Sequence, residues 1–329
     1  MRRSPNNTGL ALALVSCGCF ATSGPFAASL IAAGWTPGAA VTARVAIAAL
    51  VLAIPAAIQL RSQRPTRRSL RTLLVYGLLA VAGAQLCFFN AVAHLSVAVA
   101  LLLEYSGILL VVAWGWARHG LRPPRLTVAG GVVALGGLAL VLNLVGSQRL
   151  DPVGLLWAVG AAIGLAAYFV LTAQDDGSLA PLVMAGGGLA VGALVLGAAA
   201  AAGVMPWHAP ATTVLLLGRS MSWLVPVLGL SLLAAAISYV TGIAGVRLLG
   251  ARLASFVGLT EVLFAVLFAW LLLGQRLAIV QVLGGGLVVA GIALVRLDEL
   301  RGGDSPLVRP STAEIEGAST YAEAQRHSS

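Results

Sequence analysis

The chain has 329 residues, of which 59% are hydrophobic and only 9% are charged, and its mean hydropathy is +0.97. Soluble globular proteins carry about 25% charged residues, so this composition excludes a water-soluble fold and predicts an integral membrane protein. The formal net charge of +9 could suit a nucleic-acid partner, but the arginines that produce it stand between apolar stretches, which argues against nucleic acid.

Ten apolar stretches follow one another along the chain, each long enough to cross a bilayer as a helix. Helices are the natural choice because a backbone in lipid must satisfy its own hydrogen bonds, and the alternation typical of strands is absent. The first stretch is too long for a signal peptide and is predicted to be an uncleaved helix. The predicted spans are 8–33, 37–60, 72–93, 95–116, 125–144, 153–173, 180–203, 224–246, 250–273 and 277–297.

Polar segments flank and interrupt these spans. Residues 1–7 are predicted as a short N-terminal segment, and residues 298–329 as a disordered polar tail. Residues 204–222 form the longest connection, where Trp207 and His208 suggest a segment at the membrane interface. Fourteen arginines flank the spans on the side of the N-terminus and three lie on the opposite side. Both termini of this multi-pass protein are therefore predicted to lie in the cytoplasm, beneath the cell membrane.

The chain repeats itself. Residues 78–141 align without a gap onto 232–295 with 19 identities in 64 pairs, where composition alone would give about one in eight. Upstream the match continues at an offset of 144, where Pro37 meets Pro181. The halves are predicted to be five-helix repeats at 8–144 and 153–297. Because five is odd, the second repeat enters the membrane from the opposite side, and the fold class is all-α with two inverted repeats.

No cofactor is predicted. Cys17, Cys19 and Cys87 stand inside apolar stretches and are interpreted as small buried hydrophobes rather than as a metal site or a disulfide framework. The chain has no lysine, which excludes a Walker A phosphate-binding loop and direct ATP coupling through one. Energy would come from an ion gradient, substrate exchange or diffusion.

Three charged residues lie within predicted spans: Glu104, Glu261 and Arg44. A charge in hydrocarbon is costly, so each is expected to face a cavity or a partner. The acids could bind a proton or a substrate amine; alternatively, each is a neutral carboxylic acid bonded to helix backbone. Arg44 could face an acid or a substrate carboxylate; alternatively, it snorkels or bonds a nearby carbonyl.

Further polar and amphipathic side chains occur in spans one, three, six and eight, where they could hydrogen-bond a small polar substrate. The alternative for each is a contact between packed helices. Pro25 is expected to kink span one. These candidates are Ser23, Gln85, Asn90, Trp157, Tyr168 and Tyr239.

Two stretches carry a family resemblance. They are LCFFNAVAHLSVAVALLLEYSG at 86–107 and RLLGARLASFVGLTEVLFAVLFAWLLLGQ at 247–275. The chain resembles the ten-helix EamA-type transporters of the drug/metabolite transporter superfamily over 8–297. The resemblance implies a central cavity between the repeats, lined by spans one, three, four, six, eight and nine, and transport by alternating access. Many bacterial members export metabolites or amino acids, and others import.

The sequence thus predicts a secondary transporter that exports small polar metabolites such as amino acids, with proton coupling through the buried acids as one option. Import, or movement of a drug or nucleotide sugar, stays open, as does a sensor that has lost transport. A membrane-embedded enzyme needs clustered acids or a nucleophile with its base, and no predicted span holds two acids. The expected partners are a small-molecule substrate, protons or another coupling ion, and the lipid bilayer; a homodimer is left open.

Overall fold

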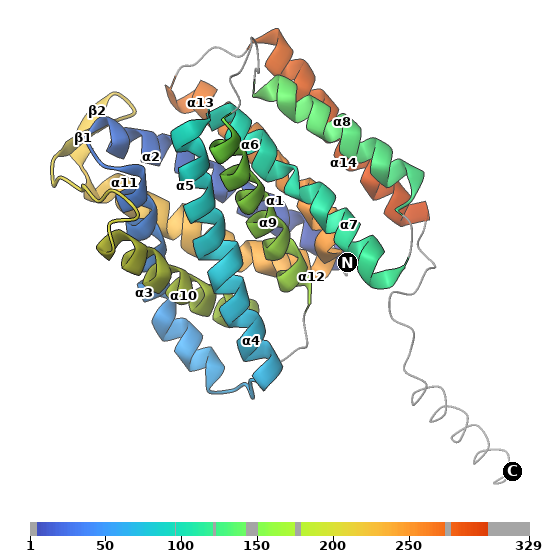
Figure 1. Cartoon of the computed structure of the whole chain (residues 1–329), viewed down its shortest axis with the longest axis horizontal. Helices are drawn as coiled ribbons and strands as arrows, with labels where there is room; N and C mark the ends of the chain where they lie inside the picture. The colour runs from blue at the N-terminus through green and yellow to red at the C-terminus, as the bar shows by residue number, and fades with distance from the viewer. Residues whose placement is uncertain are drawn as a thin grey trace, which may run out of the picture.

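The computed structural model describes residues 5–95, 97–120, 123–142, 151–174, 179–273 and 278–301. Long helices lie side by side in one bundle, with α8 and α14 as a pair along one edge (Figure 1). Eight helical stretches in the described part are long and apolar enough to cross a membrane, and α8 is a shorter apolar helix. An α-helical membrane protein is therefore confirmed, while the count of ten spans and their inversion stay predictions.

Some sequence predictions fall on residues that the structure leaves undescribed. The predicted N-terminal segment is described only from Pro5, where the first helix already begins. The tail predicted from 298 is described only to Arg301, as the last turn of α14. Two of the three arginines assigned to the outer side, Arg149 and Arg276, also lie outside the described residues.

The helices of the first half contain two breaks, at Thr22 and Ser106, and one π-helical segment. Span one divides at Thr22, whose hydroxyl donates to the carbonyl of Cys19 at 2.6 Å. Pro25 removes a backbone donor one turn later, so the expected kink is present. The elements are α1 (Pro5–Ala21), α2 (Ser23–Ala32), α3 (Pro37–Leu60), α4 (Arg67–Val75), the π-helix η1 (Tyr76–Gly83), α5 (Ala84–His94), α6 (Val97–Tyr105), α7 (Gly107–His119) and α8 (Arg125–Val141).

The second half follows the same order. The predicted boundary between spans eight and nine coincides with Gly250, whose φ of 79° and ψ of 160° interrupt α12. Such a φ is accessible to glycine because it has no Cβ. The elements are α9 (Pro152–Ala173), α10 (Pro181–Ala201), β1 (Thr213–Leu216), β2 (Arg219–Ser222), α11 (Leu224–Ser231), the π-helix η2 (Leu232–Ile237), α12 (Ser238–Gly258), α13 (Thr260–Leu273) and α14 (Ile279–Arg301).

The long connection contains an antiparallel hairpin, a small exception to the predicted all-α class. Strands β1 and β2 pair through Thr213 and Ser222, and the turn between them has positive φ at Leu217 and Gly218, as tight hairpins require. The segment is anchored because the indole of Trp35 donates to the carbonyl of Pro210 at 2.9 Å. The hairpin therefore lies against α2 at one end of the bundle (Figure 1).

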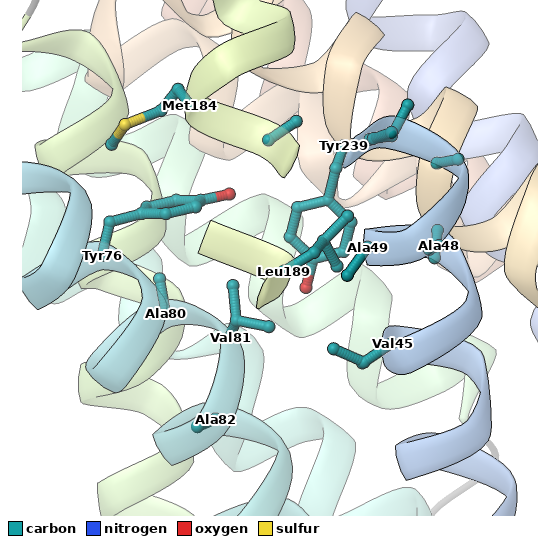
Figure 2. Packing of buried hydrophobic residues seen from close by; sticks show 14 of the residues in the cluster. Val45, Ala48, Ala49, Tyr76, Ala80, Val81, Ala82, Met184, Leu189 and Tyr239 are labelled. Carbon is teal, nitrogen blue, oxygen red and sulfur yellow. The ribbon is translucent and has the colours of Figure 1, made fainter. Parts of the chain in front are cut away.

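A core of side chains joins the two halves. It contains Val45 from α3, Tyr76 from η1, Leu189 from α10 and Tyr239 from α12, and Figure 2 shows these four side chains in the cluster. Gly188 allows this approach, because a side chain there would collide with the ring of Tyr76. The second span of each half thus packs against the third span of the other.

The outer surface of the bundle is apolar. Leu50, Ile54, Leu156 and Leu194 are each more than 70% exposed. Large apolar side chains in such numbers are unfavourable in water but suit the hydrocarbon of a bilayer. This apolar surface agrees with the composition of the chain. Many polar residues of the spans face the interior of the bundle instead.

Candidate functional site

A cavity of about 230 Å³ lies inside the bundle. Its wall is built from α1, α2, α3, η1, α5, α6, α9, α12 and α13, so both halves of the chain contribute. This agrees with the six spans that the family resemblance implies and adds α3, through Arg44. Pockets for drug-sized ligands have volumes of about 300–1,000 Å³, so this cavity suits a smaller solute. Its polar wall residues are Ser16, Cys17, Ser23, Arg44, Gln85, Glu104, Tyr105, Tyr168, Tyr239 and Glu261.

Most of the candidates from the sequence meet in this wall, and two lie outside it. Asn90 donates its amide to the carbonyl of Leu86, one turn back on the same helix, at 2.7 Å. Trp157 packs with a separate apolar cluster around Ala91 and Leu95. The candidates that line the cavity are Ser23, Arg44, Gln85, Glu104, Tyr168, Tyr239 and Glu261.

The two acids stand beside equivalent helix breaks. Glu104 lies two residues before the break at Ser106, and Glu261 follows the break at Leu259. At these breaks the hydroxyl of Ser106 donates to Leu103 at 2.5 Å, and that of Thr260 to Val257 at 2.7 Å. The repeat offset of 154 relates the two bonds. Serine and threonine hydroxyls that bond back to a carbonyl bend helices, which fixes where the carboxyl groups enter the cavity.

A tyrosine connects the acids of the two halves. The side chain of Tyr105, next to Glu104 in the chain, lies beside the carboxyl group of Glu261 in the cavity wall. The two carboxyl groups are also close enough for their charges to interact. Sequence reasoning did not select Tyr105, although it belongs to the Glu-Tyr-Ser-Gly motif at 104–107. Its role depends on a residue more than 150 positions away, which no local pattern reveals.

Arg44 has one firm partner and one unused donor. Its side chain is 8% exposed, and its Nη2 donates to the carbonyl of Ala234 at 2.6 Å. The guanidinium carbon lies 5.3 Å from the centre of the Phe20 ring, within cation–π range. Its Nε has no hydrogen-bond partner, and among the described residues no ion pair joins Arg44 to either acid within 4.0 Å. Donor capacity therefore remains at the cavity.

Aromatic rings cover much of the remaining wall. Tyr239 lies 5.1 Å from Phe20 and 6.1 Å from Tyr168, measured between ring centres. Gln85 lines the cavity together with Tyr239. Gly242 makes room for Tyr168 and Ser16, since a Cβ there would collide with both hydroxyl oxygens. The wall therefore offers apolar faces with hydroxyl and amide groups at their edges.

The sequence profile of the EamA-like transporter family matches residues 7–143 and 152–297, one stretch in each half. The chain belongs to the EamA-like transporter family. The resemblance drawn from the two motif regions is thereby confirmed, and the family is a transporter family.

Two further proteins are similar to this chain, one in sequence and one in fold. A UPF0060 membrane protein of Streptomyces coelicolor is 35% identical over 104 residues, which are 31% of this chain and 89% of that protein. The relative is therefore much shorter. A solved structure, described only as a crystal structure of a protein, superposes with a TM-score of 0.72 at 20% identity, covering 90% of this chain and 99% of its own. At that identity the likeness concerns the fold alone.

Proposed function

We propose that this EamA-like protein is a secondary transporter that exports small polar metabolites, such as amino acids, across the cytoplasmic membrane by alternating access. The observation that carries the proposal is the internal cavity, where Glu104, Glu261 and Arg44 meet in a wall contributed by both halves. Charged groups inside a membrane protein mark substrate or ion pathways.

The chemistry of the wall supports an amino-acid-like substrate. Glu104 and Glu261 could accept a substrate ammonium group, and the free donor capacity of Arg44 suits a carboxylate. The rings of Phe20 and Tyr168 offer apolar contact to a side chain. Two carboxyl groups against one guanidinium favour a zwitterion or an amine over an anion.

Packing between α8 and α14 supports the inverted arrangement that alternating access requires. A Cβ at Gly130 would lie 2.7 Å from the carbonyl oxygen of Gly291, and one at Gly137 would lie 2.6 Å from that of Gly284. The repeat offset makes Gly130 equivalent to Gly284, and Gly137 to Gly291. These contacts are reciprocal, as across a two-fold axis. They also run in opposite directions along equivalent helices, which favours opposite orientations of the halves in the membrane.

The proposal includes proton coupling, because the same site contains two carboxyl groups. If a carboxyl group binds either a proton or the substrate ammonium group, but not both, an inward proton gradient drives substrate outward. Glu104 and Glu261 are suited to this exchange because their charges interact and both face the cavity.

Flux through liposomes tests the proposal. Purified protein is reconstituted with each labelled amino acid inside, a proton gradient is imposed, and release is compared with protein-free liposomes. We expect faster release of at least one amino acid, and a slower rate when the gradient is collapsed. Leu194→Ala, on the exposed apolar surface, is the matched control and should transport normally.

The alternative functions predict different outcomes in this assay. Drug-like cations and nucleotide sugars are tested in the same liposomes, and reversed gradients test import. Absence of flux for all of these solutes would contradict a transporter and favour a sensor or assembly role.

A further inference from the structure

Both halves contain a π-helix at the same place. These are η1 (Tyr76–Gly83) and η2 (Leu232–Ile237), and the repeat offset of 154 maps residues 78–83 onto 232–237. π-helical turns are rare and concentrate at functional sites. Their occurrence at equivalent positions of both halves makes this part of the third span a candidate hinge in each half.

Each π-helix packs against the second span of the opposite half. Helix α10 contacts η1, and α3 contacts η2. At the equivalent positions of these second spans stand Gly188 and Arg44, related by the upstream offset of 144. Gly188 admits the ring of Tyr76 and offers no side chain, whereas Arg44 donates to the carbonyl of Ala234 within η2. The two halves therefore differ at this contact.

The counterpart of Ala234 in the first half is Ala80, seen beside Tyr76 in Figure 2. Within the described residues, no side chain donates a hydrogen bond to the Ala80 carbonyl. Ala234 receives the short bond from Arg44 at 2.6 Å and a longer one from Ser238 at 3.5 Å. A hydrogen bond from a buried charged donor is about twice as strong as a neutral one. The second π-helix is therefore fastened to α3, and the first is not fastened in this way.

We propose that Arg44 is a positioning residue that holds the second π-helix closed, so that the two equivalent hinges of the transporter open unequally. In the conformation described, η2 is fixed to α3 by the guanidinium and η1 is the more easily opened hinge. The inference rests on the proposed transport function, because it assigns the hinges to alternating access. It goes further by giving Arg44 a conformational role in addition to any contact with substrate.

The position of Arg44 links this bond to the cavity. The same guanidinium lines the cavity wall and retains an unpartnered Nε. A carboxylate that bound Nε would therefore contact the same guanidinium whose Nη2 donates to the Ala234 carbonyl. One side chain thus joins the cavity to the second π-helix.

Amide hydrogen exchange of the purified full-length protein tests the proposal without any substrate. Exchange reports the free energy of local opening. In the wild type we expect residues 232–237 to exchange more slowly than residues 76–83. In Arg44→Gln, exchange at 232–237 should rise about tenfold relative to 76–83, as expected for the loss of a hydrogen bond to a charged group. Arg44→Lys, which keeps a charged donor, should recover part of the protection.

A matched control separates this effect from general destabilisation. Leu189→Ala removes a fully buried side chain from the core that contains both tyrosines, and it should raise exchange at both π-helices together. An equal rise at both π-helices in Arg44→Gln, or unchanged exchange at 232–237, would overturn the proposal. If Arg44→Gln does not fold, the wild-type comparison decides, and equal or reversed rates overturn it. Because no transport is measured, its failure is distinct from failure of the proposed function.

Discussion

Glu104 and Glu261 reach one cavity from different halves of the chain but are not equivalent residues. The repeat aligns Glu104 with Gly258 and Glu261 with Gly107. Both glycines are in close contact, Gly258 with the ring of Phe169 and Gly107 with the carbonyl of Ala162. A side chain at Gly107 would collide with this backbone, whereas one at Gly258 would require the Phe169 ring to move. The packing of each half therefore explains why its acid lies near the same helix break but not at the position used by the other half.

Replacing the acids one at a time tests their role in substrate binding. Glu104→Gln and Glu261→Gln keep the side-chain volume and remove the charge, so each should weaken the contact with a substrate ammonium group. Loss of a hydrogen bond to a charged group costs about 1.5–3 kcal/mol, which corresponds to a KM raised about tenfold or more. The measurement is the initial rate of release from liposomes across substrate concentrations and pH values.

Asn90→Ala is the control for these variants, because the Asn90 amide bonds its own helix and does not line the cavity. It should leave KM and the pH profile unchanged. If both glutamine variants match the wild type at every pH, the acids have a structural role and do not bind substrate.

At the scale of whole elements, hydropathy predicts where helices lie but not where they break. The predicted span 37–60 coincides with α3, and 153–173 differs from α9 by one residue at its start. The break at Ser106 was not predicted, because it depends on a hydroxyl bonding its own backbone, and the bond from Arg44 to η2 was not predicted, because it joins two helices far apart in the chain. Apolar periodicity carries no signal for such bonds.

In the candidate site too, some residues could be predicted from the sequence and others could not. Charged residues in apolar spans were identifiable because burying a charge without a partner is unfavourable, and all three lie in the cavity wall. Asn90 could not be separated from Gln85 by sequence, since a polar side chain can satisfy itself on its own helix. The sequence does not distinguish Phe20 from other apolar residues, whereas the structure places the guanidinium of Arg44 over its ring.

The start of α9 offers a test at the element scale. Asp151 caps this helix by accepting from the backbone N–H of Val153 at 2.9 Å, and its other oxygen lies 2.8 Å from Nδ1 of His94. The Val153 bond first, and then the His94 bond, lower the pKa of the Asp151 carboxyl below its ordinary value of 3.8. The stability that this provides is complete above that ordinary value and is lost as pH falls through the lower pKa of the folded state.

Asp151→Asn isolates the charge, because asparagine also caps helices well but does not titrate. We expect the wild type to have the higher Tm at neutral pH and the difference to disappear in strong acid. The measurement is thermal unfolding of both proteins in detergent from neutral pH to below pH 3.8. A difference in Tm that stays constant across this range would show that the carboxylate charge contributes nothing.

At the scale of the whole molecule, the duplication gives two halves that share the order of their helices and differ in many of their side chains. The contacts between α8 and α14 are reciprocal, so each half contributes the equivalent glycines to them. The short relative from Streptomyces coelicolor matches only 31% of this chain. The hairpin β1–β2 lies between α10 and α11, whereas α3 is joined to α4 by a short turn in the first half. The halves can therefore carry different side chains on one backbone plan.

Labelling of single cysteines tests the orientation of this frame in the cell membrane. Leu217, at the tip of the hairpin, is 52% exposed, and Ser62 lies in the exposed turn between α3 and α4. Arginines crowd the Ser62 side of the bundle, so that side should face the cytoplasm. A membrane-impermeant maleimide added to intact cells should label Leu217→Cys, and should label Ser62→Cys only after the cells are permeabilised.

The three native cysteines set the background of this experiment, since Cys17 is buried and Cys19 and Cys87 are partly buried within helices. The unaltered protein should therefore label weakly and serves as the control. The opposite pattern, with Ser62→Cys labelled in intact cells, would reverse the predicted topology, because the hairpin and the arginine-rich turn lie at opposite ends of the helix pair α3 and α10 (Figure 1). The coupling would be unaffected, because an exchange of protons for substrate at Glu104 and Glu261 takes its direction from the proton gradient of the cell and not from the orientation of the protein.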